Sequence, residues 1–321
     1  MINKIIIVAG DPNSINLEII SKTWRKLDKI TKKKIYLIAN YELVQKQFKK
    51  LNLKNKIIKI DNIKDECASE NLKIINVPLS FSNPFNVPLR NVSKYVLNSL
   101  NLAHNLAKKK IVKGIINCPI NKRIIKKTNK IGVTEYLAYK CKIIKDSEVM
   151  MISNKQLSVV PLTTHINVKN ISKNIKISLI IKKVLTLDND FKKLFKKKPK
   201  IGVLGLNPHN SELAKNSEEI KKIIPAISIL KKKGIKIKGP LVADTVFVEN
   251  YKQYDVIVGM YHDQVLAPFK TLFHFNAINI TLGLNYVRVS PDHGPAIDLI
   301  GKNKANYISL FQCVQFINNL T

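Results

Sequence analysis

Short apolar runs rich in β-branched residues alternate with segments of helical character along nearly the whole chain. Residues 4–9 and 35–39 are apolar runs typical of strands buried on both faces. Residues 91–108 repeat apolar side chains every three or four positions, as the buried face of a helix does, and a helix is also predicted over 16–27. Such alternation indicates a largely parallel sheet flanked by helices, so we predict an α/β fold.

The chain is long for a single hydrophobic core. Its 321 residues favour two domains. We predict that residues 1–125 and 285–321 form a first α/β/α domain and that residues 126–284 form a second. The first boundary is placed where a basic helix near 120–130 interrupts the alternation of strands and helices.

The composition favours a cytoplasmic protein. No apolar stretch reaches the roughly 18 residues of a membrane-spanning helix, so no membrane partner is expected. The first apolar run is short and lacks a small-residue cleavage site, so it is interpreted as a strand and not as a signal peptide. The four cysteines are spread along the chain without a C-x-x-C pair, which indicates reduced thiols.

The net charge of +33 raises the alternative of a nucleic-acid-binding protein. The lysines, however, lie in many short clusters, such as 32–34, 108–110 and 231–233, and form neither one basic tail nor a patch interleaved with aromatic residues. We therefore interpret the charge as a general drift in composition and do not expect nucleic acid to be the main partner. An anionic substrate would still be attracted.

Three histidines follow predicted strands by a few residues. They are His165, His209 and His262, and each precedes a helix or loop. Because the carboxyl ends of parallel strands lie along one edge of a sheet, the three imidazoles could converge there. Three such ligands would leave a position open on a divalent ion, where a substrate hydroxyl could bind. The alternative is that each histidine caps a helix or bonds a backbone carbonyl.

Charged residues surround the His262 segment. Lys270 and Arg288 both suit a phosphate or carboxylate group. Asp244 and Asp263 are candidate catalytic acid/base groups or partners that orient the histidines. Asp244 could equally serve as the N-cap of a helix that begins near Thr245.

Seven segments, in this order, resemble those of the 4-hydroxythreonine-4-phosphate dehydrogenase (PdxA) family. They span nearly the whole chain and are GDP at 10–12, MMISNKQLSVVPLTTH at 150–165, GLNPH at 205–209, GPLVADT at 239–245, MYHDQ at 260–264, NITLGL at 279–284 and DHGPA at 292–296.

The resemblance implies a fold like that of isocitrate and isopropylmalate dehydrogenases, with two α/β/α domains around a cleft. It also implies a homodimer whose active sites lie at the subunit interface. The residues that it assigns are the metal ligands His165, His209 and His262, the substrate contacts Thr134, Lys270, Asn279 and Arg288, and the nucleotide-binding residues Gly283, Asp292 and His293. His293 could instead cap the helix that follows it.

The activity implied is oxidation of a phosphorylated hydroxythreonine by NAD(P)⁺ with a divalent metal such as zinc, cobalt or magnesium. The β-keto acid formed would lose CO₂ and give 3-amino-2-oxopropyl phosphate, on the route to pyridoxal 5′-phosphate. The nicotinamide cofactor carries the hydride chemistry, and the protein supplies orientation and charge.

The chain departs from the family pattern at three places. Val133 stands where the family has a histidine before Thr-Glu, and the loops after Asp11 and His209 lack the family's glycines. These changes leave open a dehydrogenase of another phosphorylated hydroxy acid, such as a four-carbon sugar-acid phosphate, and a metal-binding scaffold without turnover.

Overall fold

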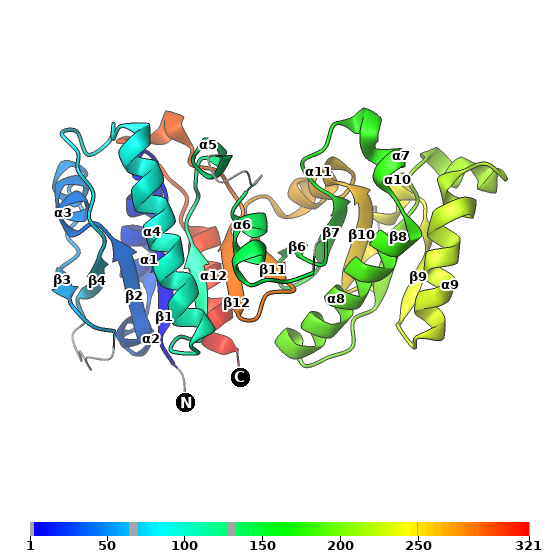
Figure 1. The fold of residues 1–321 in the computed structure, drawn as a ribbon, viewed down its shortest axis with the longest axis horizontal. Helices are drawn as coiled ribbons and strands as arrows, with labels where there is room; N and C mark the ends of the chain where they lie inside the picture. Colours follow the sequence, from blue (N-terminus) through cyan, green and yellow to red (C-terminus); the bar gives the residue numbers. More distant parts are fainter. Residues whose placement is uncertain (1–2, 64–69, 127–131, 145, 249, 321) are drawn as a thin grey trace. The chain divides into compact units, whose positions relative to one another are not determined.

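Strands and helices alternate through both of the units into which the chain divides (Figure 1). The computed structural model describes residues 3–63, 70–126, 132–144, 146–248 and 250–320. The first unit comprises Met1–Cys141 and Asn285–Thr321, and the second comprises Lys142–Leu284. The predicted first boundary lies after residue 125, whereas the first unit continues to Cys141. Helix α6 (Val133–Lys140) belongs to it because the Tyr136 hydroxyl donates to Asn101 Oδ1 on α4 at 2.8 Å.

Within its described residues, the first unit has a wholly parallel sheet in the order β3-β4-β2-β1-β5-β12. The strands β1, β2 and β5 are buried along their whole length, as their apolar sequences predict. The strand bounds are β1 (Ile5–Val8), β2 (Ile35–Ala39), β3 (Ile57–Ile60), β4 (Leu72–Asn76), β5 (Gly114–Asn117) and β12 (Val287–Pro291).

The helices of the first unit cover this sheet. Helix α4 packs on β1, β2 and β5, whereas α12 packs on β1, β5 and β12 and against α1 (Figure 1). Besides α6, the helix bounds are α1 (Asn16–Lys26), α2 (Lys29–Lys34), α3 (Tyr41–Lys50), α4 (Leu89–Lys108), α5 (Lys122–Lys126), the 3-10 turn η5 (Ile297–Leu299) and α12 (Ile308–Asn319).

The sheet of the second unit is mixed and has the order β11-β6-β7-β10-β8-β9. Strand β6 runs antiparallel to β7 and β11, whereas β7, β10, β8 and β9 are parallel. Residues 154–157 therefore connect β6 and β7 as a hairpin, as the turn residues Asn154 and Lys155 predict. The strand bounds are β6 (Val149–Ser153), β7 (Ser158–Thr163), β8 (Ile201–Leu204), β9 (Ile237–Leu241), β10 (Val256–Tyr261) and β11 (Ile278–Leu282).

One long helix of the second unit differs from its prediction. A helix is expected over 171–185, but the structure has a short α7 and then α8, which continues to Phe195. The apolar spacing of Val184, Leu187 and Phe191 extends the buried face, and the helix ends where Lys196 turns left-handed. The bounds are α7 (Ile171–Asn174), α8 (Ile177–Phe195), α9 (Ile224–Lys232), α10 (Ala243–Val246), α11 (His262–Phe273), the 3-10 helices η1 (Val168–Asn170), η2 (Pro208–Leu213) and η4 (Asn250–Gln253), and the π-helix η3 (Glu219–Ile223).

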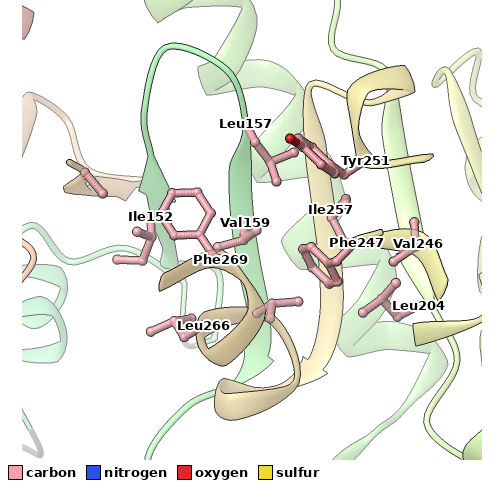
Figure 2. Packing of buried hydrophobic residues seen from close by; sticks show 12 residues of the cluster. Ile152, Leu157, Val159, Leu204, Val246, Phe247, Tyr251, Ile257, Leu266 and Phe269 are labelled. Carbon is pink, nitrogen blue, oxygen red and sulfur yellow. The ribbon is translucent and has the colours of Figure 1, made fainter. Parts of the chain in front are cut away.

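Helix α11 is anchored by a core cluster of the second unit. Figure 2 shows Leu266 and Phe269 of this helix among Val159 of β7, Ile257 of β10 and their neighbours, and Phe269 is fully buried. This packing fixes the helix that begins at His262 and carries Lys270.

The predicted α/β class is confirmed. In the part of the chain that the structure describes, no helix combines the length and the apolar character that a bilayer span requires.

Candidate active site

The carboxyl ends of three adjacent parallel strands of the second unit carry the predicted histidines. Strand β10 lies between β7 and β8, with Tyr261 opposite Thr163 and Val258 opposite Val203. His165 follows β7 by two residues, and His262 directly follows β10 as the first residue of α11. The strand register thus places these residues at one edge of the sheet, as expected.

His165 and His262 lie beside each other. Their ring centroids are 5.9 Å apart. Zinc–nitrogen bonds are about 2.0–2.1 Å long, so two rings at this separation can both reach one ion. His262 Nδ1 lies 2.6 Å from Asp263 Oδ1. An ionised carboxylate can only accept, so this contact suits the neutral tautomer with its proton on Nδ1, which leaves the Nε2 lone pair for a metal.

The structure does not bring His209 into this pair. His209 Nε2 lies 3.7 Å from Asp244 Oδ2, beyond hydrogen-bond distance, and both side chains are exposed. Among the described residues, no three His, Cys, Asp or Glu side chains are grouped closely enough to hold a metal ion. Residues 209–213 all have φ between 46° and 58°, and the role of His209 as third ligand stays a prediction.

The position of Asp244 also rules out its predicted alternative role as a helix cap. Asp244 lies inside α10, whose N-cap is Val242, and no side chain caps this helix. The exposed carboxylate of Asp244 remains a candidate to orient the His209 ring, which lies 3.7 Å away.

Thr163 and Gln264, which the sequence analysis did not single out, hold together the strand ends that carry the histidines. The Thr163 hydroxyl donates to the Met260 carbonyl at 2.7 Å. Gln264 Oε1 accepts from the Met260 amide at 2.7 Å, and its Nε2 donates to the Gly205 carbonyl at 2.7 Å. These bonds join the ends of β7, β10 and β8. Gln264 lies in the quoted MYHDQ segment, but its bonding partners could not be derived from that motif.

Two glutamates hold the loop that precedes His209. Glu219 is fully buried, and its Oε1 accepts from the Leu206 and Asn207 amides at 2.7 and 2.9 Å. Burial pushes the pKa of Glu219 up, but the hydrogen bonds from Asn207 and Leu206 outweigh it, so the pKa is lowered. Glu218 Oε2 accepts from Asn207 Nδ2 at 2.9 Å. The GLNPH segment is therefore held by a buried anion.

The predicted substrate residues of the second unit lie on α11 and β11. Lys270 is half-buried in the last turn of α11. Asn279 is half-buried on β11, and its Oδ1 has no hydrogen-bond partner among the described residues although the atom itself is buried. A buried oxygen of this kind is costly unless a donor meets it. A ligand hydroxyl or amine would supply that donor.

Gly283, a predicted nucleotide-binding residue, already uses its amide. The Gly283 N–H donates to Asp190 Oδ2 at 2.6 Å. Its φ of 90° is accessible to glycine, and a Cβ at this position would lie 3.0 Å from the Ser147 carbonyl. Gly283 therefore lets the chain after β11 pass close to the Ser147 backbone, and its own N–H is not presented to a nucleotide.

In the first unit, the structure brings Arg288 and Thr134 together. Arg288 Nη1 lies 3.4 Å from Thr134 Oγ1, and Arg288 Nε donates to Asn117 Oδ1 at 2.5 Å. Burial lowers the pKa of the Arg288 guanidinium to about 10, so the group stays cationic at neutral pH. Asn117 was not predicted. The register pairs Arg288 with Ile115, which leaves Asn117 as its diagonal neighbour on the same face.

Asp292 and His293 lie at the carboxyl end of β12 in the same unit. The Asp292 amide donates to Ser309 Oγ at 2.9 Å. His293 Nδ1 lies 2.9 Å from the Gly294 carbonyl. The following turn η5 has Ala296 as its N-cap and no side-chain cap, so the alternative role of His293 as a helix cap is wrong. The Ile15 amide donates to the Pro295 carbonyl at 3.3 Å, so the loop after β1 contacts the loop after β12.

From its place in the helix predicted over 91–108, His104 is expected to be an ordinary surface or boundary histidine, and the structure corrects this prediction. It is 3% exposed, and its Nδ1 lies 2.9 Å from the Tyr286 hydroxyl. Burial, and after it the charges of Lys140 and Lys108, lowers its pKa. The helical pattern placed His104 correctly on α4, but Tyr286 is 182 residues away in the chain.

The chain resembles solved α/β dehydrogenases in fold. A solved 4-hydroxythreonine-4-phosphate dehydrogenase from Klebsiella pneumoniae superposes with a TM-score of 0.86 at 27% identity, covering 99% of each chain. A structure titled as a putative enzyme of the same name, from Salmonella typhimurium, gives a TM-score of 0.87 at 27% identity over 100% of each chain.

The chain belongs to the PdxA family. The family model described as pyridoxal phosphate biosynthetic protein PdxA matches residues 31–317. A curated relative from Aquifex aeolicus, named 4-hydroxythreonine-4-phosphate dehydrogenase, is 39% identical and covers 100% of this chain and 99% of its own length. The resemblance found in the seven sequence motifs is thereby confirmed.

Proposed function

We propose that this chain oxidises 4-hydroxythreonine 4-phosphate with NAD(P)⁺, as the names of its relatives indicate for those proteins. The hydride would leave the carbon that bears the hydroxyl group, and the hydroxyl proton would leave as the ketone forms. The β-keto acid would then lose CO₂ and give 3-amino-2-oxopropyl phosphate. The observation that carries the proposal is family membership over nearly the whole chain, and it favours this reading over a nucleic-acid-binding role.

A divalent metal is part of the proposal. The pair His165 and His262 fits such an ion in chemistry and spacing, and His209 is the expected third ligand although the structure does not group it with them. When bound, the ion would polarise the substrate hydroxyl. Asp263 would hold the Nδ1 proton of His262 and so keep Nε2 available. The exposed carboxylates of Asp244 and Asp263 are the candidate proton acceptors.

The substrate is anionic, and the proposed contacts suit it. Arg288 presents a buried guanidinium beside Thr134, a combination that can bind a phosphate or carboxylate oxygen through charge and a hydroxyl donor. Lys270 would add a second cation, and Asn279 would accept from a hydroxyl or amino group through its unsatisfied Oδ1.

The nicotinamide nucleotide is proposed to bind near Asp292 and His293 in the first unit. The Gly283 amide is already bonded to Asp190, so this residue would contribute only by allowing the positive φ at the end of β11. A homodimer with its active sites at the subunit interface and a cytoplasmic location remain predictions that come with the family resemblance.

The test is NAD(P)H formation from 4-hydroxythreonine 4-phosphate by purified protein loaded in turn with zinc, cobalt or magnesium. A four-carbon sugar-acid phosphate serves as the competing substrate, because Val133 replaces an imidazole at the first residue of α6. Faster turnover of the hydroxythreonine supports the proposal. Turnover of the sugar-acid phosphate alone would reassign the substrate, and no turnover of either by protein that binds metal would favour a scaffold.

A further inference from the structure

Helix α1 holds both ends of the segment between Pro295 and Ala305. Near its start, the Ile15 amide donates to the Pro295 carbonyl at 3.3 Å. Two turns further along, Lys22 Nζ donates to the carbonyls of Asn303 and Ala305 at 2.9 and 3.1 Å. The segment is therefore tied at each end to a single rigid element.

A buried carboxylate completes the second tie. Glu18 is 2% exposed, and its Oε1 accepts from Lys22 Nζ and from the Ala305 amide, each at 2.7 Å. Burying a carboxylate is costly unless charged or polar donors meet it. Glu18 therefore fixes Lys22, and both fix the backbone at 303–305 through charge-assisted hydrogen bonds.

A second glutamate–lysine pair shows that helix stability does not require this burial. Glu42 and Lys46 on α3 have the same i, i+4 spacing and the same 2.7 Å separation as Glu18 and Lys22, but their side chains are 62% and 49% exposed. Such a pair supports its own helix. The Glu18–Lys22 pair differs in that its remaining contacts reach residues more than 280 positions away.

We propose that Glu18 and Lys22 are positioning residues for the nicotinamide nucleotide. The segment held along α1 begins three residues after Asp292, and the end that Glu18 and Lys22 fix exposes the cations Lys302 and Lys304 on either side of the tethered Asn303. A segment fixed in this way can present positive charge to the nucleotide's diphosphate without losing chain entropy on binding. The inference rests on the proposed function, in which Asp292 and His293 contact this nucleotide.

The experiment compares Lys22→Met, Lys22→Arg and Glu18→Gln with the matched surface variants Lys46→Met and Glu42→Gln. The dissociation constants of NAD⁺ and NADP⁺ are measured by equilibrium binding, and KM values are measured for nucleotide and phosphorylated substrate. We expect Lys22→Met to weaken nucleotide binding about tenfold, with kcat and the substrate KM nearly unchanged. Lys22→Arg, which keeps the donors, should restore most of the affinity. Glu18→Gln keeps the acceptor for Ala305 and should have a smaller effect than Lys22→Met.

Hydrogen exchange of the peptide containing Ala305 supplies a readout that does not need turnover. It should speed up in Lys22→Met and slow down when nucleotide is added to the unmodified protein. Faster exchange with unchanged nucleotide affinity would overturn the proposal, because the pair would then be purely structural. Equal losses of nucleotide and substrate affinity would also overturn it. If the unmodified protein binds nucleotide but shows no turnover, the proposed reaction fails while the nucleotide affinities still decide this inference.

Discussion

Arg288 Nε donates to Asn117 Oδ1 at 2.5 Å, and both side chains are at least 97% buried. Two adjacent parallel strands, β5 and β12, thus fix the cation proposed to bind the substrate. A hydrogen bond to a charged group contributes roughly 1.5–3 kcal/mol. The orientation of Arg288 therefore depends on a neutral side chain that no charge pattern in the sequence would identify.

Replacing Asn117 should weaken substrate binding. We expect Asn117→Ala to raise the KM for 4-hydroxythreonine 4-phosphate more than the KM for the nucleotide, because the guanidinium loses the acceptor that orients it. Folding stability should fall by about 1.5–3 kcal/mol, as measured by urea denaturation. The half-buried Asn91, which donates to the Ser80 carbonyl in a solvent-exposed hydrogen bond, is the matched control. Unchanged substrate KM in a folded Asn117→Ala protein would contradict the role.

The two adjacent histidines should control metal content. His165→Ala and His262→Ala are each expected to reduce bound zinc or cobalt, measured by elemental analysis after dialysis, and to abolish NAD(P)H formation. His274→Ala changes an exposed histidine on the same stretch of chain and should retain both properties. Comparison with His209→Ala then decides whether the ion has a third imidazole ligand. Full metal content in His209→Ala would restrict the site to the pair.

Acid should destabilise the loop before His209 through Glu219. The pKa of this carboxylate is lowered in the folded protein, so its contribution to stability is complete above its unfolded value near 4.5 and is lost as the pH falls through the folded pKa. We therefore expect the denaturation midpoint to be nearly constant at neutral pH and to drop as the pH falls below about 4.5. Glu219→Gln should flatten this dependence, whereas the exposed Glu42→Gln should leave the slope unchanged.

The packing of Phe269 on α11 should contribute strongly to the free energy of unfolding. Phe269 is fully buried in the core cluster (Figure 2), so Phe269→Ala is expected to cost about 3–5 kcal/mol of unfolding free energy. Phe275→Ala, at a phenylalanine that is 54% exposed, is the control and should cost far less. Urea denaturation followed by circular dichroism measures both. Similar small effects in the two variants would show that the cluster does not hold the helix.

Element positions were largely predictable because they are encoded over short distances. The strand predicted over 35–39 is β2, and the helices predicted over 16–27 and 91–108 are α1 and α4, with bounds that differ by two residues at most. Each pattern lies within a few turns or residues, where periodicity alone selects helix or strand. The prediction ended this helix at residue 185, but α8 continues to Phe195. The apolar spacing that continues through Leu187 and Phe191 could have shown this.

The sequence by itself determined which chemical groups stand at the strand ends. His165 follows β7 and His262 follows β10, as the sequence predicts, whereas Arg288 lies within β12. Only the tertiary structure decided which of these groups meet: His262 with His165, Arg288 with Asn117, and Glu18 with Ala305. Those pairs join residues up to 287 positions apart. Their contacts depend on strand register and helix packing, which no local pattern specifies.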